Sequence, residues 1–369
     1  PARSGPDHDV LGAPTVVAAG STIVYAGNGP TPYERHLYRA ATENGASSRM
    51  TTAPGQHRAT PSPDGRWFAV LHSDDQTPTD LYVMALDGDA MRRVTDSPAR
   101  EFKERQWARA RYVRFPSRID DYTLHARILE PAVLEPGRKY PVIFGPMYSN
   151  TVRNRWSGVY AAVQQLMVQK GYIVVQVDVR GSTGYGREFR EAFLTDFAGD
   201  DIEDIASAVG YLKTLPYVDA DRLGIWGSSY GGTLSVYTLL KKPGLFRAGV
   251  AAAAAVDPFF FGTDDVAIVR RPDSHPLIFE NQASTLAANL QDHLLLMHGM
   301  QDQVVPFKTV AELADALIRE GKDFDTAFVP GATHAWSREP HYGQYLFRKL
   351  LAHFDRHLMP ETLSGNRSP

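Results

Sequence analysis

Residues 225–232 read Ile-Trp-Gly-Ser-Ser-Tyr-Gly-Gly, and the five residues from Gly227 to Gly231 fit the pattern G-x-S-x-G. The apolar run Arg222 to Trp226 predicts a strand before this motif, and Thr233 to Leu240 predicts a helix after it. A tight strand-to-helix turn of this kind holds the central serine hydroxyl out of the sheet. The stretch therefore predicts an α/β fold with Ser229 as its candidate nucleophile.

Two further candidates follow Ser229 in the chain order Ser, Asp, His, which is the order of an α/β-hydrolase. Asp302 comes after the apolar run Leu294 to Met297, and His334 comes after the run Thr326 to Val329. Open α/β sheets place their sites just past the carboxyl ends of their strands. We expect His334 to take the proton of Ser229, and Asp302 to fix the imidazole tautomer and stabilise the imidazolium.

Other residues compete for these roles. Ser228 is the rival nucleophile, and it is disfavoured because only Ser229 has glycine two residues away on both sides. Three acids compete with Asp302 but occupy less suitable positions, before a strand or in a charged loop: Asp292, Asp323 and Asp325. His298 ends a strand and is expected to be structural.

The composition excludes several classes of protein. The chain has 369 residues, 43% of them hydrophobic, which is enough for a large core and two domains. A net charge of −3 argues against a nucleic-acid partner. Without cysteine there is no disulfide, thiolate metal site or cysteine nucleophile. No membrane helix or signal peptide is visible, and a start at Pro1 suggests a processed or truncated product. Periplasmic, secreted and cytoplasmic locations all remain open.

Residues 1–110 contain an internal repeat with an offset of 44 residues. Two matches define it: Leu37-Tyr38 recurs as Leu81-Tyr82, and Arg49-Met50-Thr51 recurs as Arg93-Val94-Thr95. A period of about 40–45 residues with four short strands is typical of a β-propeller blade. Two blades cannot close a propeller, which needs about 4–8. We therefore interpret this domain as the C-terminal blades of a larger propeller, whose remainder was removed or lies on another chain.

Residues 111–369 alternate between apolar runs and helical stretches. The expected strands are Tyr112 to Arg114, Thr123 to Leu129, Val142 to Phe144, Ile173 to Val177, Leu223 to Trp226, Gly249 to Ala253, Leu294 to Met297 and Thr326 to Val329. The expected helices are Val159 to Lys170, Asp200 to Lys213, Thr233 to Leu240, Thr309 to Glu320 and Tyr342 to Leu358. The first two strands are expected to form an antiparallel pair. The alternation predicts an α/β-hydrolase domain with a doubly wound, mostly parallel sheet.

Three stretches carry a family resemblance: Asp178 to Gly186 (Asp-Val-Arg-Gly-Ser-Thr-Gly-Tyr-Gly), Val218 to Gly232, and His298 to Asp302 (His-Gly-Met-Gln-Asp). Together they resemble the prolyl oligopeptidase family of serine peptidases, its dipeptidyl peptidase IV branch in particular. The resemblance covers roughly residues 110 to 360. It implies an exo- or oligopeptidase whose propeller admits only short or unstructured peptides, with no metal and no organic cofactor.

The resemblance also suggests the remaining site residues. One oxyanion donor would be the backbone N–H of Tyr230, and the second would be the hydroxyl of Tyr148, with a packing aromatic as the alternative. The aromatic S1 pocket, which suits proline, would be lined by Phe259, Phe260 and Phe261, of which Phe261 matches best. Core packing is the alternative for these rings. Arg180 would be either a clamp for a substrate carbonyl or carboxylate, or a structural hydrogen-bond donor.

Two departures from the family pattern concern substrate binding. The dipeptidyl peptidase branch grips the substrate amino terminus with paired glutamates, and this chain contains no adjacent Glu-Glu. Either that motif lies in the missing blades, or the chain is not a dipeptidyl peptidase. The family often has Asn shortly after the triad Asp, whereas Gln303, Val304 and Val305 follow Asp302 here.

Three functions are therefore compared. The leading expectation is a serine peptidase that cleaves short peptides through an acyl-enzyme, dipeptidyl peptidase-like, with Pro or Ala at P1. The second is an esterase or acylaminoacyl-releasing hydrolase, because fold and triad do not choose the acyl group. The third is a catalytically silent binding module. A short peptide is the expected partner, with no nucleic acid and no membrane, and a homo-oligomer remains open.

Overall fold

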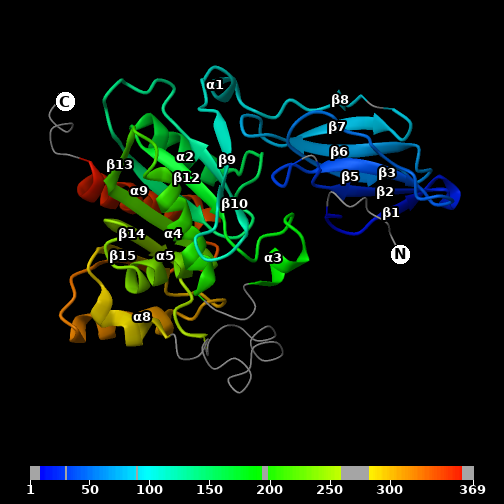
Figure 1. Ribbon diagram of the computed structural model, residues 1–369. Coiled ribbons are helices and arrows are strands. Elements are labelled where there is room, and N and C mark those ends of the chain that lie inside the picture. Colours follow the sequence, from blue (N-terminus) through cyan, green and yellow to red (C-terminus); the bar gives the residue numbers. More distant parts are fainter. Residues whose placement is uncertain (1–8, 30, 89, 193–197, 259–281, 360–369) are drawn as a thin grey trace. The chain divides into compact units, whose positions relative to one another are not determined.

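The computed structural model describes residues 9–29, 31–88, 90–192, 198–258 and 282–359 (Figure 1). The chain divides into two compact units. The N-terminal unit comprises Pro1–Ala110, Val152–Ala162 and Ser182–Arg190. The α/β unit comprises Arg111–Thr151, Val163–Gly181 and Glu191–Pro369. The two short segments at 152–162 and 182–190 thus group with the N-terminal unit, whereas the sequence pattern places them in the second domain.

The N-terminal unit contains two four-stranded antiparallel sheets. The first is β1 (Thr15–Val17), β2 (Thr22–Gly27), β3 (His36–Ala41) and β4 (Ser47–Arg49). The second is β5 (Gln56–Pro61), β6 (Trp67–Ser73), β7 (Asp80–Ala85) and β8 (Arg92–Arg93). Apolar side chains from both sheets form one buried core: Val17, Val24, Leu37, Met50, Phe68, Val70 and Met84. The short helices η1 (Ala18–Gly20) and α1 (Arg100–Lys103) lie in the same segment.

The 44-residue repeat is a repeat of hydrogen bonding. In the first sheet the backbone N–H of Leu37 donates to Oγ1 of Thr51 at 3.0 Å. In the second sheet the N–H of Leu81 donates to Oγ1 of Thr95 at 2.9 Å. The repeated residues thus hold equivalent positions in two small antiparallel sheets. Their assignment to a β-propeller stays a prediction.

The α/β unit is built on an eight-stranded, mostly parallel sheet of order β16-β15-β14-β13-β11-β12-β10-β9. Its strands are β9 (Ala110–Pro116), β10 (Thr123–Leu129), β11 (Tyr140–Met147), β12 (Ile173–Asp178), β13 (Val218–Ser228), β14 (Ala248–Ala252), β15 (His293–Gly299) and β16 (Asp325–Val329). The strands β12 and β13 lie on opposite sides of β11, so the winding direction reverses there. Ligands of open α/β sheets bind at the carboxyl ends of strands beside such a reversal.

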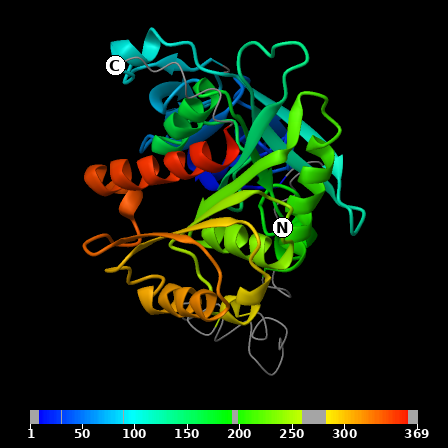
Figure 2. The ribbon, with the colours of Figure 1, turned by 90° about the vertical axis from the view of Figure 1, so that its left-hand side faces the viewer.

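The helices are α2 (Val159–Gln169), α3 (Arg187–Glu191), α4 (Asp200–Leu212), α5 (Tyr230–Lys241), η4 (Ala283–Asn289), α8 (Phe307–Arg319), η5 (Trp336–Arg338) and α9 (Pro340–Leu358). The helices α9 and α5 cover opposite faces of the sheet, as Figure 2 shows in red and yellow-green. Glycines let both pack closely. A Cβ on Gly224 would lie 2.7 Å from Phe354 of α9, and one on Gly249 would lie 2.6 Å from Leu239 of α5.

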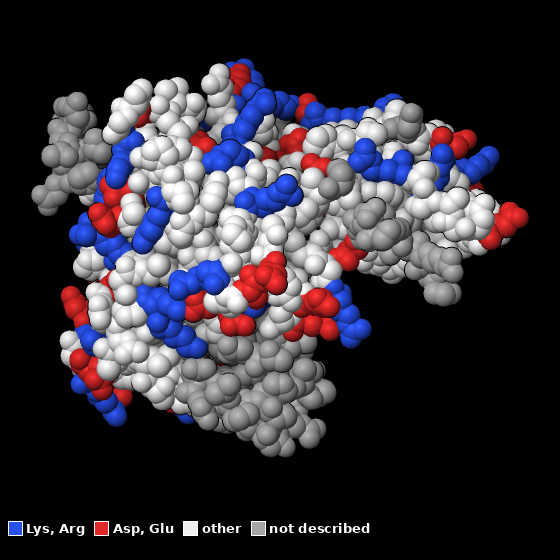
Figure 3. All heavy atoms as spheres, viewed as in Figure 1, with Lys and Arg blue, Asp and Glu red and all other residues white. Residues whose placement is uncertain are grey.

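The predicted strands and helices of this unit are all present, with some shifted ends. The strand β13 begins at Val218 rather than Leu223, because Val218 pairs with Tyr140 of β11. The helix α5 begins at Tyr230 rather than Thr233, directly after the candidate nucleophile. No helix within the described ranges is long and apolar enough to cross a membrane. Basic and acidic side chains share the same parts of the face drawn in Figure 3, as a small net charge leads one to expect.

Candidate active site

Ser229 occupies a strained turn between β13 and α5. Its backbone angles are φ 59° and ψ −126°, a conformation that non-glycine residues rarely adopt. The turn is held from both sides, because the N–H of Ser229 donates to the carbonyl of Ala252 at 2.9 Å and its carbonyl accepts from Thr233 at 3.0 Å. Such strain costs about 1–3 kcal/mol and clusters at functional sites. Ser228, the rival, is a paired residue of β13.

Three glycines make this turn sterically feasible. A Cβ on Gly231 would lie 1.7 Å from the carbonyl oxygen of Met147 at the end of β11. Cβ atoms on Gly227 and Gly232 would each lie 2.4 Å from backbone atoms, of Gly231 and Ala252 respectively. Backbone atoms cannot move aside as a flexible side chain can. The glycines of the motif are therefore required by the close approach of strand and helix.

Asp302 and His334 form a hydrogen-bonded pair. His334 Nδ1 lies 2.7 Å from Asp302 Oδ2, and because a carboxylate can only accept, Nδ1 carries the proton. In a neutral imidazole Nε2 is then the acceptor, which is the state that a general base requires. The side chain of Asp302 is fully buried, while that of His334 is 24% exposed and accessible to a substrate.

The surroundings of Asp302 keep its carboxylate charged and fixed. Its Oδ1 accepts the backbone N–H groups of Val304 at 2.9 Å and Val305 at 2.8 Å. Burial alone would raise the pKa of Asp302, but the hydrogen bonds from His334 and these two amides outweigh it, so the pKa is lowered. Nearby His298 is buried and its Nε2 donates to the Val305 carbonyl, as expected of a structural residue.

The register of the sheet brings the three candidates to one edge. The paired residues follow one another across the sheet: Ser228 with Ala252, Ala252 with Met297, and Gly299 with Val329. Ser229, Asp302 and His334 therefore all follow the carboxyl ends of neighbouring parallel strands. The competing acid Asp325 stands at the opposite end of β16, about 13 Å from Val329 at about 3.3 Å per residue.

The candidate oxyanion donors lie beside the turn. Tyr230 is the first residue of α5, and its side-chain hydroxyl donates to Asp201 at 2.6 Å. Tyr148 follows β11 at the point where Met147 pairs with Gly227. Its ring contacts the ring of Tyr230 edge-on, with centroids 5.6 Å apart, and it is 42% exposed.

Arg180 is surrounded by acids. Its guanidinium makes two bonds to Asp204, at 3.0 and 2.7 Å, and lies 3.1 Å from both Asp120 and Asp200. Its side chain is only 3% exposed. Burial would lower the pKa of Arg180, but the Asp204 carboxylate outweighs it and raises the pKa. These contacts are the ones expected of a structural hydrogen-bond donor.

Two supporting acids were not singled out from the sequence. Asp178 ends β12 and accepts the N–H of Thr151 at 2.6 Å, which anchors the loop that carries Tyr148. Asp201 holds the Tyr230 hydroxyl from the first turn of α4. In the sequence, the only indication of a role for Asp178 is that it begins the stretch Asp178 to Gly186. The expected S1 residues Phe259, Phe260 and Phe261 lie outside the described residues.

The chain is similar to known peptidases. Residues 159–361 match the model of the prolyl oligopeptidase family. Human dipeptidyl peptidase 8 is 28% identical over 91% of this chain and 39% of its own length. The Bacillus subtilis protein named uncharacterized peptidase YuxL is 28% identical over 80% of this chain and 46% of its own. The chain thus spans less than half of these relatives.

A solved structure agrees with these matches. The crystal structure of Porphyromonas gingivalis dipeptidyl peptidase 4 superposes with a TM-score of 0.85 at 26% identity, over 95% of this chain and 51% of that one. A motif-bearing α/β sheet, a strained serine turn and an Asp-His pair are in place on this chain. Because the family match covers more than half of its residues, the chain belongs to the prolyl oligopeptidase family.

Proposed function

We propose that this chain carries the catalytic site of a serine peptidase, with Ser229, His334 and Asp302 as its triad. The observation that carries the proposal is the 2.7 Å bond from His334 Nδ1 to a buried, doubly anchored Asp302, on the sheet edge where Ser229 sits in its strained turn. The family match and the dipeptidyl peptidase relatives support the same reaction class.

The reaction follows from the chemistry of these groups. Ser229 Oγ attacks the carbonyl carbon of the scissile bond while His334 Nε2 takes its proton. The carbonyl oxygen becomes an oxyanion, which the Tyr230 N–H and the Tyr148 hydroxyl stabilise. The imidazolium, stabilised by Asp302, returns the proton to the leaving amine as the C–N bond breaks. Water then adds to the acyl-enzyme in the same way, releasing the acid and restoring Ser229.

The proposed substrates are short peptides with Pro or Ala at P1, cleaved in dipeptidyl peptidase mode. Two relatives, human dipeptidyl peptidase 8 and the Porphyromonas gingivalis enzyme, bear dipeptidyl peptidase names. The run Phe259 to Phe261 is proposed to line an apolar S1 pocket, which would reject charged side chains because an unpaired buried charge costs several kcal/mol. The two sheets of the N-terminal unit are proposed to be propeller blades, completed by further blades that lie outside this chain.

A second candidate is an esterase or acylaminoacyl-releasing hydrolase on the same triad. It is kept as an alternative because the fold and the triad do not choose the acyl group. Turnover of unblocked Ala-Pro nitroanilide, its blocked counterpart and a p-nitrophenyl ester separates the two candidates. Peptidase function predicts that a nitroanilide is cleaved, and exclusive ester cleavage would contradict it.

Covalent labelling tests the nucleophile. A fluorophosphonate probe should label the chain and its Ser228→Ala variant, and it should not label Ser229→Ala. Loss of a triad member lowers turnover by about 10⁴–10⁶. Labelling of Ser229→Ala at another serine would contradict the assignment. A chain that folds but takes no label at all would instead indicate a silent binding module.

A further inference from the structure

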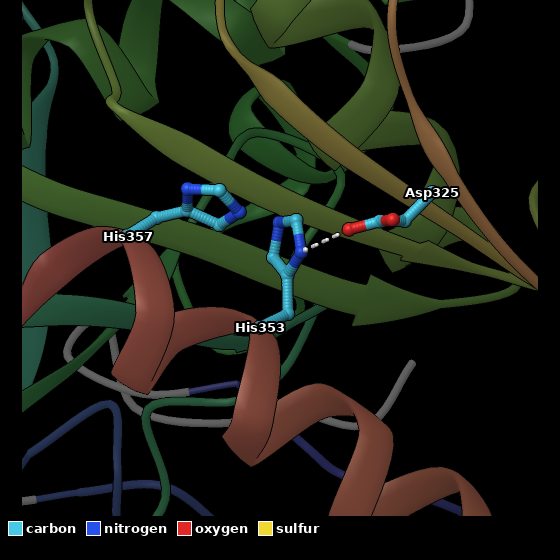
Figure 4. Close-up of side chains that lie close together, drawn as sticks. All are labelled: Asp325, His353 and His357. Carbon is cyan, nitrogen blue, oxygen red and sulfur yellow. Dashed lines mark ion pairs between the residues drawn. The ribbon is translucent and has the colours of Figure 1, made fainter.

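A second cluster of reactive side chains lies at the end of β16 away from the proposed triad. Asp325 begins β16, while His353 and His357 lie on the last two turns of α9. Figure 4 shows the His353 ring between His357 and Asp325, with the Asp325 carboxylate directed at the His353 ring. They line a surface cavity of about 160 Å³ together with His293 and Arg356.

The spacing of these residues suits a metal ion. His353 and His357 are four residues apart on one helix, so their side chains lie on the same face. One ligand atom from each of the three residues lies within 4.8 Å of the others. His353 Nδ1 is 3.4 Å from Asp325 Oδ2. Two ligands about 2.05 Å from a tetrahedral zinc ion stand about 3.3 Å apart, close to this separation.

The hydrogen bonding of His353 indicates which of its ring nitrogens faces Asp325 without a proton. Its Nε2 lies 3.2 Å from the carbonyl oxygen of His293, which can only accept, so Nε2 carries a proton. In the neutral ring Nδ1 then holds a lone pair. This atom is buried and faces a carboxylate oxygen of Asp325 at 3.4 Å, a long contact for a hydrogen bond. Two acceptors that face each other need a cation between them, and a ligating histidine typically donates its other N–H to a carbonyl in this way.

Two other cations compete for this position. Arg356 reaches Asp325 Oδ2 at 3.2 Å, but its side chain is 64% exposed and can turn into solvent. A proton on His353 Nδ1 would make an imidazolium inside a side chain that is 3% exposed, which costs desolvation energy. A divalent ion satisfies Asp325, His353 and His357 together. The ring of His357 stacks on the ring of His293, with centroids 3.8 Å apart.

We propose that Asp325, His353 and His357 bind one divalent transition-metal ion, best Zn²⁺, with water as its fourth ligand. Two imidazole nitrogens and one carboxylate oxygen form a donor set typical of zinc, and zinc tolerates the tetrahedral geometry. The ion would tie the C-terminal turns of α9 to the first residue of β16. The site takes no part in the proposed peptidase reaction, so it stands or falls independently of it.

Isothermal titration of the chelator-treated chain with ZnCl₂ tests the site. One Zn²⁺ per chain with micromolar affinity is expected, together with a rise in melting temperature. His357→Gln should weaken binding at least tenfold, and its half-buried position makes it safer for folding than a change at His353. Co²⁺ bound to the same chain should show the visible absorption of a tetrahedral ion, and His357→Gln should lose it.

Matched variants locate the ion. His341→Gln changes an exposed histidine on the first turn of α9 and should leave zinc binding unaltered. Arg356→Gln removes the competing cation and should tighten binding. Zinc that binds His357→Gln within twofold of the parent affinity would overturn the proposal, since the ion would then be held elsewhere, for example by His334. Failure of the folded parent chain to bind Zn²⁺ at all would overturn it equally.

Discussion

Replacement of Asp302 by Asn tests the geometry of the proposed triad most directly. Asp302 Oδ1 accepts two backbone N–H groups, so the single oxygen of an asparagine must occupy that position. The amide NH₂ then takes the place of Oδ2, 2.7 Å from His334 Nδ1. An NH₂ group can only donate, so Nδ1 becomes the acceptor and the proton moves to Nε2. His334 can then no longer accept the proton of Ser229.

Asp302→Asn should lower kcat strongly while the protein stays folded. A triad histidine held in the wrong tautomer loses about 10⁴ in kcat, which is about 5.4 kcal/mol of transition-state stabilisation. Because Asn is isosteric and keeps both backbone hydrogen bonds, the melting temperature should change little. Steady-state kinetics on a cleaved nitroanilide, with melting followed by circular dichroism, measures both.

A matched control separates this effect from loss of charge. Asp292→Asn makes the same chemical change in the same unit, and it keeps an acceptor for the N–H of Gly244. Its kcat should stay within about threefold of the parent value, as expected of a substitution that spares the transition state. If Asp302→Asn retained more than a tenth of the parent kcat, the tautomer reasoning would be wrong and another acid would serve His334.

Three further changes have defined outcomes. Tyr148→Phe should lower kcat about 10²–10³-fold, because it removes one oxyanion donor. KM and the melting temperature should change little, because the side chain is exposed. An unchanged kcat would indicate that Tyr148 is a packing residue. Gly231→Ala should destabilise the fold by about 3 kcal/mol or more in a urea titration, since its Cβ would meet a backbone carbonyl at 1.7 Å. As a control, the Cβ of Gly210→Ala in α4 meets nothing within 4 Å, so this variant should be as stable as the parent chain or more stable. Burial lowers the pKa of His57 to about 4, so its contribution to stability is fully present above its unfolded pKa of about 6.5 and is lost as the pH falls toward 4, a change of about 3 kcal/mol. Urea unfolding of the N-terminal unit at several pH values measures this change. The free energy of unfolding should depend less steeply on pH in His57→Gln than in the parent chain. An equal dependence on pH in both would show that His57 does not cause the loss of stability.

The sequence was most informative where local signals and chain order coincide. Apolar runs such as Leu294 to Met297 predicted buried strands because a parallel sheet buries both faces of its strands. Since parallel strands end at the same edge, the order Ser229, Asp302, His334 then predicted a common location. The structure adds the angles of Ser229 and the 2.7 Å bond between the other two residues.

Features assembled from distant segments could not be predicted in this way. Nothing local to Arg180 shows that Asp120, Asp200 and Asp204 converge on its guanidinium. The loop position of Asp325 makes it a candidate triad acid, because the histidines of α9 that meet it come much later in the chain. The grouping of residues 152–162 and 182–190 with the N-terminal unit likewise depends on long-range contacts that carry no sequence pattern.

The threonine contacts of the repeated sheets have a consequence for association. Strands β4 and β8 end at Arg49 and Arg93. Beyond them, the hydroxyls of Thr51 and Thr95 accept the backbone N–H groups of Leu37 and Leu81, which a longer outer strand would have paired. The outermost strands β4 and β8 are therefore only three and two residues long, with exposed polar or charged side chains. A short, charged edge offers an incoming strand little to pair with. These two margins are thus poor templates for edge-to-edge aggregation, because each outer strand is short and the threonine hydroxyl satisfies the next amide of its inner neighbour.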